Sequence, residues 1–270
     1  MKKFLAIMLV LVLLISIVAC GKKDETPNDE EAAATTAPAK HVYQEENSDD
    51  KFGYAVNAQG DYDIVSFDSA DVQHKVTIPS EIDGIPVTGI ADEAFKSAWQ
   101  ITEVVIPDTV EYIGISAFYD CKYLAKVDMP DSVTKIAEAA FNGCIALDNL
   151  TLSKELTEIG DGAFLGCTSL KKIVFTDKLT TIGKGAFQNC TALAEVKISA
   201  SVVEIKDGAF QGCTALNSIE IPATVKTFGK FIFTTVDAGN DDFKIIAAAD
   251  SDAAAYAEAN EYKLEVPAAE

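Results

Sequence analysis

The sequence predicts a repeat solenoid, a right-handed β-solenoid or horseshoe built from 23-residue units. Two observations lead to this fold class. Seven phenylalanines recur at a constant spacing of 23 residues, from Phe95 to Phe233. Pairs of apolar residues two positions apart, such as Val104 and Ile106, recur at the same spacing and give each unit one short, half-buried strand. A fixed period of this length with one strand per unit is typical of stacked supersecondary units.

Residues 1–19 are predicted to be a lipoprotein signal peptide, because Lys2 and Lys3 precede an apolar run too short to span a bilayer comfortably. The sequence "IVAC" at 17–20 resembles the lipobox of bacterial lipoproteins. This resemblance implies a bacterial protein whose first mature residue, Cys20, carries two acyl chains, which suffice for stable membrane anchoring. The expected location is the extracellular face of the cytoplasmic membrane or the cell surface. The alternative is a secreted protein cut elsewhere, in which Cys20 has no role.

The chain carries 22 basic and 42 acidic side chains, a net charge of −20, and it contains no arginine. Such a surface repels phosphate backbones and anionic lipid, so nucleic acid is not an expected partner. Residues 20–50 are rich in Ala, Thr, Asp and Glu and lack the apolar side chains of a core, so they are predicted to form a disordered acidic tether behind the lipidated Cys20. A flexible coil of this length spans roughly 25–30 Å.

Residues 76–236 are predicted to form the solenoid, in about seven units of strand, corner, apolar return and phenylalanine. One unit cannot bury an apolar core alone, so neighbouring units must stack. Because adjacent strands lie about 4.8 Å apart, successive phenylalanines come within ring-stacking distance. The predicted phenylalanine spine consists of Phe95, Phe118, Phe141, Phe164, Phe187, Phe210 and Phe233.

Both ends of the array depart from the repeat, because an exposed end would leave a bare apolar cross-section. Residues 51–75 are predicted to form an N-terminal β-hairpin cap that turns near Gly60. The extra residues "EIDGI" (81–85) of the first unit are predicted to form a loop. Residues 237–270 are predicted to form a C-terminal strand-helix-strand cap, in which Ser251 or Asp252 caps an alanine-rich helix.

Five cysteines share the period and are expected to stack in one column: Cys121, Cys144, Cys167, Cys190 and Cys213. Ala98 and Val236 take the same position in flanking units, so the leading interpretation is a buried thiol that acts as a small hydrophobe. Disulfides between neighbouring units are an alternative, although five is an odd number and parallel side chains suit the disulfide dihedral poorly. Zinc fits less well, because zinc ligands are usually two to four residues apart and both histidines lie outside the column.

No catalytic, cofactor or metal site is predicted, and the expected protein is not an enzyme. His41 lies in the tether and His74 precedes the first repeat strand, and neither has a nearby serine or cysteine partner. The Asp-rich stretch 237–242 lacks the spacing of a calcium loop and is expected to be a solvated turn.

Strand side chains that point away from the core are predicted to form a two-column face of mixed charge, the candidate surface for an extracellular protein or polysaccharide. A mixed polar face is otherwise ordinary solvated surface, and this one lacks the aromatic residues that mark hot spots. Trp99, at the edge of the first unit, is either an exposed anchor or packed against a cap. The predicted face consists of Glu103, Val105, Lys126, Asp128, Asn149, Thr151, Lys172, Val174, Glu195, Lys197, Ser218 and Glu220.

The recurring pattern "L..V.IP..V..I...AF..C..L", most complete in "LAKVDMPDSVTKIAEAAFNGCIAL" (124–147), resembles the BspA-like leucine-rich repeats of bacterial surface proteins. The resemblance covers roughly residues 50–265, including "FGY", "IPSEIDGIPVTGI" and a closing "S.A..YA..N". It implies a leucine-rich-repeat-like solenoid that adheres to host proteins, other cells or surfaces, with no shared catalytic residue. The prediction is therefore a surface-anchored adhesion module, and the alternative is a structural envelope lipoprotein with no soluble ligand.

Overall fold

The computed structural model describes residues 46–48, 51–68, 74–233 and 243–267, all within one compact unit of the chain, Lys40–Glu270. The predicted signal peptide, Cys20, most of the tether, Val236 and the Asp-rich stretch 237–242 lie outside the described residues. The domain boundaries proposed from the sequence stay predictions.

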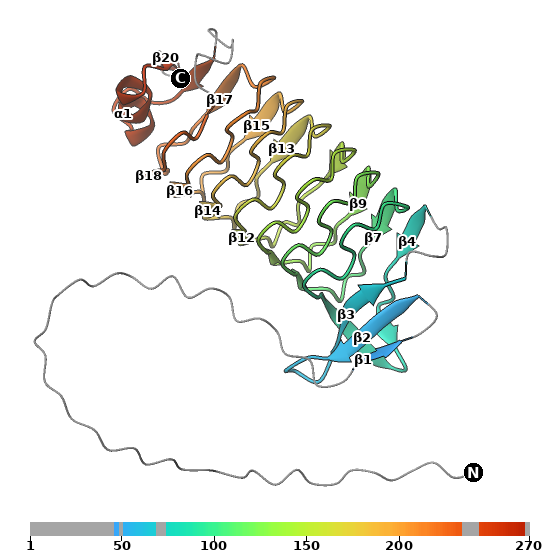
Figure 1. Ribbon diagram of the computed structural model, residues 1–270. Helices are drawn as coiled ribbons and strands as arrows, with labels where there is room; N and C mark the ends of the chain where they lie inside the picture. The colour runs from blue at the N-terminus through green and yellow to red at the C-terminus, as the bar shows by residue number, and fades with distance from the viewer. Residues whose placement is uncertain (1–45, 49–50, 69–73, 234–242, 268–270) are drawn as a thin grey trace, which may run out of the picture. The chain divides into compact units, whose positions relative to one another are not determined.

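The described residues stack as a solenoid in which a ladder of short parallel strands, interrupted after Leu150, runs along one side (Figure 1). Equivalent residues of successive turns pair in register, as Lys126 does with Glu103 and with Asn149, so the 23-residue period is confirmed as the repeat of the fold. The strands are β4 (Lys75–Thr77), β7 (Glu103–Val105), β9 (Lys126–Asp128), β11 (Asn149–Leu150), β13 (Lys172–Val174), β15 (Glu195–Lys197), β17 (Ser218–Glu220) and β19 (Lys244–Ile246).

A second ladder of parallel strands runs along the other side of the stack, where the sequence predicted only an apolar return (Figure 1). From Tyr112 onward each of its strands has only two residues, which are too few for an alternating pattern to be recognised. The strands are β6 (Ile85–Ile90), β8 (Tyr112–Ile113), β10 (Lys135–Ile136), β12 (Glu158–Ile159), β14 (Thr181–Ile182), β16 (Glu204–Ile205) and β18 (Thr227–Phe228).

The core lies between the two ladders and is centred on the phenylalanine spine, which is confirmed. All seven rings are buried, and consecutive rings stack with centroids 4.8 to 5.9 Å apart and planes within 15° of parallel. Aliphatic side chains of the strands and returns, such as Val110 and Leu156, pack around the spine without exposure to solvent. Each turn thus buries its apolar face against the turns before and after it.

A corner follows each of the first six spine phenylalanines, and its second residue has a positive φ, as in Asp120 (58°), Gly143 (77°) and Asn189 (61°). Glycine, asparagine and aspartate tolerate this left-handed conformation best, which explains the residue types at this position. The conformation points the N–H of Gly143 at the carbonyl of Leu165 in the next turn, 2.8 Å away. The corners therefore form a third backbone ladder along the stack.

An antiparallel hairpin covers the first turn: β2 (Phe52–Val56) pairs with β3 (Tyr62–Phe67), and β1 (Glu46–Ser48) adds to β2. The ring of Phe67 stacks on the first spine ring, Phe95, at 5.1 Å. The extra segment of the first unit is not a loop as predicted, because β5 (Glu81–Ile82) pairs with β6 around a turn at Asp83 and Gly84. An Asp-Gly pair with positive φ at both residues is the preferred two-residue hairpin turn, and this signal was present in the sequence.

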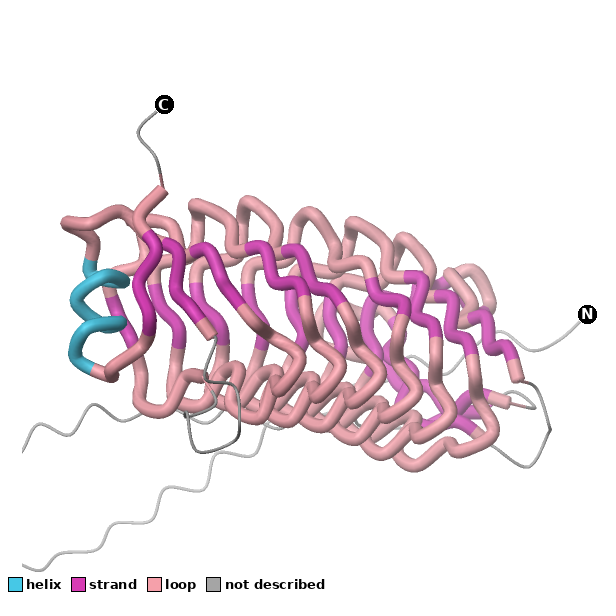
Figure 2. Tube along the Cα trace, turned by 90° about the horizontal axis from the view of Figure 1, so that it is seen from above, coloured by secondary structure: helices cyan, strands magenta, loops and turns pink. Residues whose placement is uncertain are grey.

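Helix α1 (Asp252–Ala259) and β20 (Lys263–Glu265) cover the opposite end of the stack (Figure 2). Ser251 is the N-cap of α1, since its Oγ accepts a hydrogen bond from the N–H of Ala254 at 3.2 Å. The rings of Phe243, Tyr256 and Tyr262 pack around the last spine ring, Phe233, with centroids 5.0 to 6.4 Å from it.

Candidate partner-binding face

The outward side chains of β7, β9, β13, β15 and β17, together with Thr151, form the strand face. In each of these strands the central residue is buried, as in Val104 and Ile173, while its two neighbours reach solvent. Alternation along a short strand produces this arrangement, and the inward and outward assignment made from the sequence holds for these five strands. Asn149 belongs to β11, and its side chain is outside the described part.

The strands of the face belong to two sheets. β4, β7, β9 and β11 form one sheet, and β13, β15, β17, β19 and β20 form another. Strand β11 ends at Leu150, so Thr151 lies outside it. The break lies between β11 and β13.

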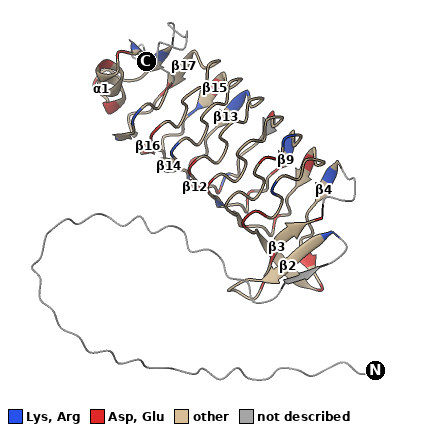
Figure 3. Cartoon of the chain, in the orientation of Figure 1, with Lys and Arg blue, Asp and Glu red and all other residues tan. Residues whose placement is uncertain are grey.

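Charged groups of the face pair with one another across neighbouring strands. The Lys126 ammonium binds Asp128 at 2.8 Å and Glu103 at 3.1 Å, and Lys75 binds the same Glu103 oxygen at 2.9 Å. Lys172 pairs with Glu195 in the second sheet. Figure 3 shows the lysines on β4, β9 and β13. The period explains the Lys126–Glu103 and Lys172–Glu195 pairs, since residues 23 apart are cross-strand neighbours.

These contacts shift the pKa values of Glu103 and Lys126. Hydrogen bonds from Lys75 and then Lys126 lower the pKa of Glu103 below its ordinary value. Hydrogen bonds to Asp128 and then Glu103 raise the pKa of Lys126. Both shifts favour the charged forms of Glu103 and Lys126, and because the pairs are open to solvent they add little to stability. A partner would meet a face whose opposite charges are largely balanced.

The cysteine column lies inside the solenoid and not on the face. All five thiols are free and buried, which confirms the interpretation as small buried side chains, and no disulfide joins them. Each Sγ–H donates to the carbonyl of the spine phenylalanine in the preceding turn, from 3.0 Å for Cys121 to 3.3 Å for Cys167. This hydrogen bond was not predicted, because the acceptor lies 26 residues away in the sequence.

A buried polar cluster at the first turn was also missed by sequence reasoning. Asp63 of β3 has no solvent exposure, and its carboxylate accepts hydrogen bonds from Asn57 Nδ2 at 2.9 Å and from the Tyr112 hydroxyl. Asn57 Nδ2 also donates to Thr88 Oγ1 at 3.0 Å. The cluster joins the hairpin to the first two turns, and its members come from segments whose meeting the repeat pattern does not predict.

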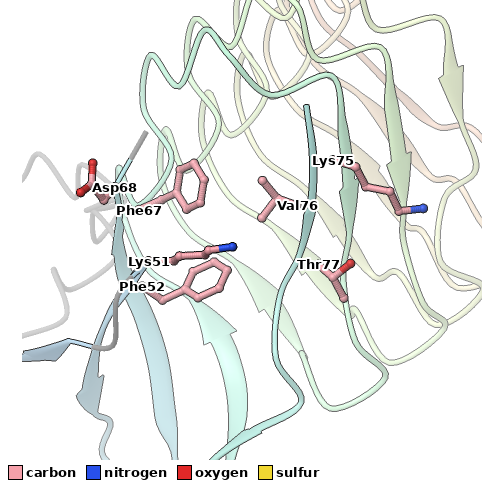
Figure 4. A pocket seen from close by; sticks show the side chains of 7 residues that line it. All are labelled: Lys51, Phe52, Phe67, Asp68, Lys75, Val76 and Thr77. Carbon is pink, nitrogen blue, oxygen red and sulfur yellow. The ribbon is translucent and has the colours of Figure 1, made fainter. Parts of the chain in front are cut away.

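A small cavity of about 130 Å³ lies between the hairpin and β4 (Figure 4). Its apolar wall is formed by Phe52 and Phe67, which face Val76 and which also cover Phe95. The cavity is therefore part of the packing of the hairpin on the first turn. Its polar lining residues are Lys51, Asp68, Lys75 and Thr77.

Trp99 is 59% exposed, so the interpretation that it packs against a cap is wrong. His74 is exposed, and its backbone carbonyl accepts hydrogen bonds from Thr102. Among the described residues, no group of three His, Cys, Asp or Glu side chains is placed to hold a metal ion. No helix in the described part of the chain is long and apolar enough to cross a bilayer.

Comparisons with known proteins give a consistent result. A sequence profile described as "BspA type Leucine rich repeat region" matches residues 88–213 and 180–243 of this chain, in six copies. A leucine rich cell surface protein from Faecalibacterium prausnitzii is 31% identical, with a TM-score of 0.68 over 77% of this chain and 55% of that chain. A leucine-rich repeat protein from Bacteroides ovatus is 28% identical, with a TM-score of 0.65 over 76% of this chain and 56% of that chain.

The leucine rich repeat protein of T. pallidum is 28% identical, with a TM-score of 0.61, and the match covers 83% of this chain and 100% of that chain. No curated protein matches the chain in sequence. The chain spans a little over half the length of the first two similar structures.

Proposed function

The chain belongs to the BspA-type leucine-rich repeat family, and on that premise we propose that it is a cell-surface protein that binds an extracellular protein or polysaccharide through its strand face. The observation that supports this most is the geometry of the face. Regular parallel strands hold rows of outward side chains in fixed positions, and extended solenoid surfaces of this kind bind partners without an enclosed pocket. The proposed role is binding and not catalysis.

The proposed location is the outer surface of a bacterium, with the membrane anchor at Cys20. The similar protein from Faecalibacterium prausnitzii is described as a cell surface protein, which supports the location for this chain. The lipobox-like "IVAC" supports the anchor, and two acyl chains at Cys20 would hold the domain at the membrane. Radiolabelled palmitate incorporation into the chain but not into a Cys20→Ala variant tests the anchor directly.

A structural envelope role is the second candidate. It is favoured by the ion pairs of the strand face, in which Lys126 and Lys172 already bind carboxylates of neighbouring strands. Paired charges leave fewer groups to attract a soluble partner. In this role the protein would space or organise other envelope proteins and bind no soluble ligand.

An exchange of charges within one ion pair separates the two candidates. The double variant Lys172→Glu with Glu195→Lys keeps the pair but reverses the charge pattern of the face, so the melting temperature should stay within about 2 °C. If a partner binds this face, the double variant should lose binding to an array of matrix proteins, bacterial surface proteins and polysaccharides.

The matched control exchanges Lys135 and Glu158, which form a 3.0 Å ion pair across β10 and β12 of the other ladder. This control should bind as the original chain does. Retained binding in the Lys172/Glu195 exchange would remove the strand face from the proposal, and silence of the original chain across the whole array would favour the structural role.

A further inference from the structure

Large apolar side chains project into solvent from the corners of the first three turns. The corners lie side by side, because the N–H of Ser97 donates to the carbonyl of Tyr119 and that of Asp120 to the carbonyl of Asn142, both at 2.7 Å. Scattered exposed apolar residues are ordinary, but a cluster of them marks an interaction site. This cluster, here called the aromatic corner, consists of Trp99 (59% exposed), Tyr119 (37%), Tyr123 (60%) and Ile145 (45%).

The fold does not need the side chains of Trp99, Tyr123 and Ile145, because later turns place small or polar residues at the same positions. The register of Trp99 and Ile145 is occupied by threonine in the next three turns, and the hydroxyls of Thr168 and Thr214 donate to the carbonyl of the preceding turn at 3.3 and 3.4 Å. The register of Tyr123 is occupied in later turns by Ala146, Ser169, Ala192 and Ala215. The later turns therefore show that the solenoid folds without large apolar residues at these positions.

We propose that the aromatic corner binds an uncharged polysaccharide, with the rings of Trp99 and Tyr123 stacked on the C–H faces of sugar rings. The inference rests on the proposed function, because it names the partner class of a cell-surface binding protein, although it uses a different surface. Flat amphipathic rings offer apolar area together with a polar edge. Successive turns are about 4.8 Å apart, close to the length of one pyranose ring, so neighbouring turns can meet neighbouring sugars.

The charges around the aromatic corner favour an uncharged partner. Lys96 binds Glu93 at 2.8 Å and lies over the ring of Tyr119, 5.8 Å from its centroid. Lys122 binds Asp120 at 3.4 Å. The local charges are therefore balanced, while the whole chain carries a net charge of −20 and has no arginine to hold a carboxylate or sulfate. Anionic polysaccharides are repelled by this surface.

The size of the aromatic corner argues against a protein partner. A stable protein interface buries about 800 Å² on each side and uses roughly 20–30 residues. The aromatic corner has four apolar side chains, and the next corners along the stack carry Thr168, Ser169 and Gln188. One polysaccharide chain lying along the corners needs only such a narrow strip.

The test uses the full chain and its single tryptophan, Trp99, as the probe. Galactomannan, xyloglucan, mixed-linkage β-glucan and dextran serve as uncharged polymers, and polygalacturonate serves as the anionic one. At least one uncharged polymer should shift Trp99 emission in a saturable way and retard the protein in a native gel. Polygalacturonate should do neither.

Two variants replace a corner residue with the residue that later turns carry at the same position. Tyr123→Ala leaves the Trp99 signal in place and should weaken binding at least tenfold, and Trp99→Thr should abolish gel retardation. Val203→Thr, at an exposed valine outside the corners, should bind as the original chain does. Unchanged binding in both corner variants would overturn the proposal.

Two further results would also overturn it: no response to any uncharged polymer, or a Trp99 shift caused by a protein of the array and by no polysaccharide. The Lys172/Glu195 exchange does not touch the aromatic corner, so the strand-face proposal stands or falls by its own measurement. If the exchange loses array binding and no polysaccharide binds the aromatic corner, only the aromatic-corner proposal fails. If the exchange keeps array binding and a polysaccharide binds the aromatic corner, only the strand-face proposal fails.

Discussion

At the scale of single residues, the cysteine column shows how a repeat selects a side chain. The thiol is small enough for the interior, and its Sγ–H finds a carbonyl in the preceding turn, as Cys190 does with Phe164 at 3.2 Å. Ala98 occupies this position in the first turn and has no Sγ–H to donate. A cysteine therefore adds a weak hydrogen bond to the burial that alanine also provides.

The column predicts a loss of stability at alkaline pH. Burial raises the pKa of Cys213 from about 9 to about 12, and it also raises the pKa values of Cys144, Cys167 and Cys190. The folded state thus keeps protons that the unfolded state releases. The stabilisation is complete below pH 9 and is lost as pH rises from about 9 towards 12, by about 1.4 kcal/mol per pH unit for each thiol.

Urea unfolding at pH 7, 9 and 10 measures this loss, with Cys213→Ala as the comparison. The variant lacks one titrating thiol, so its free energy of unfolding should fall by about 1 kcal/mol less than that of the original chain between pH 7 and pH 10. Tyr256, whose pKa burial raises to about 12, titrates equally in both proteins and cancels. Equal slopes in the two proteins would contradict the prediction.

At the scale of the element, the phenylalanine spine joins each turn to the next through stacked rings. Rings 4.8 to 5.9 Å apart make each phenylalanine a neighbour of two others, and the end rings are covered by Phe67 and Phe243. A ring in the middle of the spine has no free space beside it, because interiors of this kind are close-packed. Its removal leaves a cavity bounded by two further rings.

Phe164→Ala should therefore lower the free energy of unfolding by roughly 3–5 kcal/mol, as measured by urea denaturation. The cost combines lost apolar burial with the cavity between Phe141 and Phe187. Leu165→Ala, at the partly exposed next position, is the matched control and should cost less than about 1 kcal/mol. A melting shift of only one or two degrees for Phe164→Ala would count against the spine.

At the scale of the whole molecule, the described turns are joined only to their neighbours. Strand, return and corner residues each bond to residues about 23 positions away, as Phe141 N–H does with Ala163 O at 2.7 Å. Stability of such a stack is close to a sum of turns and of contacts between adjacent turns. The length of the solenoid is therefore adjustable in steps of one period.

Deletion of residues 147–169, one full period, should leave a folded protein, because Ala146 is then followed by Leu170 in the register of Leu147. Circular dichroism should keep its shape, and urea unfolding should stay cooperative with a smaller m-value. Deletion of residues 147–173 removes four residues more, so the joined turn cannot close and the stack should be disrupted. Equal folding of both deletions would contradict a stack in fixed register.

The sequence by itself determined the period, the spine, the cysteine column and the inward or outward direction of the residues in β7, β9, β13, β15 and β17. The first three follow from contacts between residue i and residue i+23, which the repeated pattern records directly, and the last follows from alternation along each strand. The strongest functional inference from sequence alone, the outward strand face, depends on the same rule.

Only the tertiary structure decided the second strand ladder, the break after Leu150, the polar cluster around Asp63, the balanced charges of Lys126 and the exposure of Trp99. These features depend on how side chains of different register meet across turns and at the ends of the stack. The 23-residue period identifies which positions are neighbours. The packing of side chains that differ in size and charge decides which groups pair and which remain exposed to solvent.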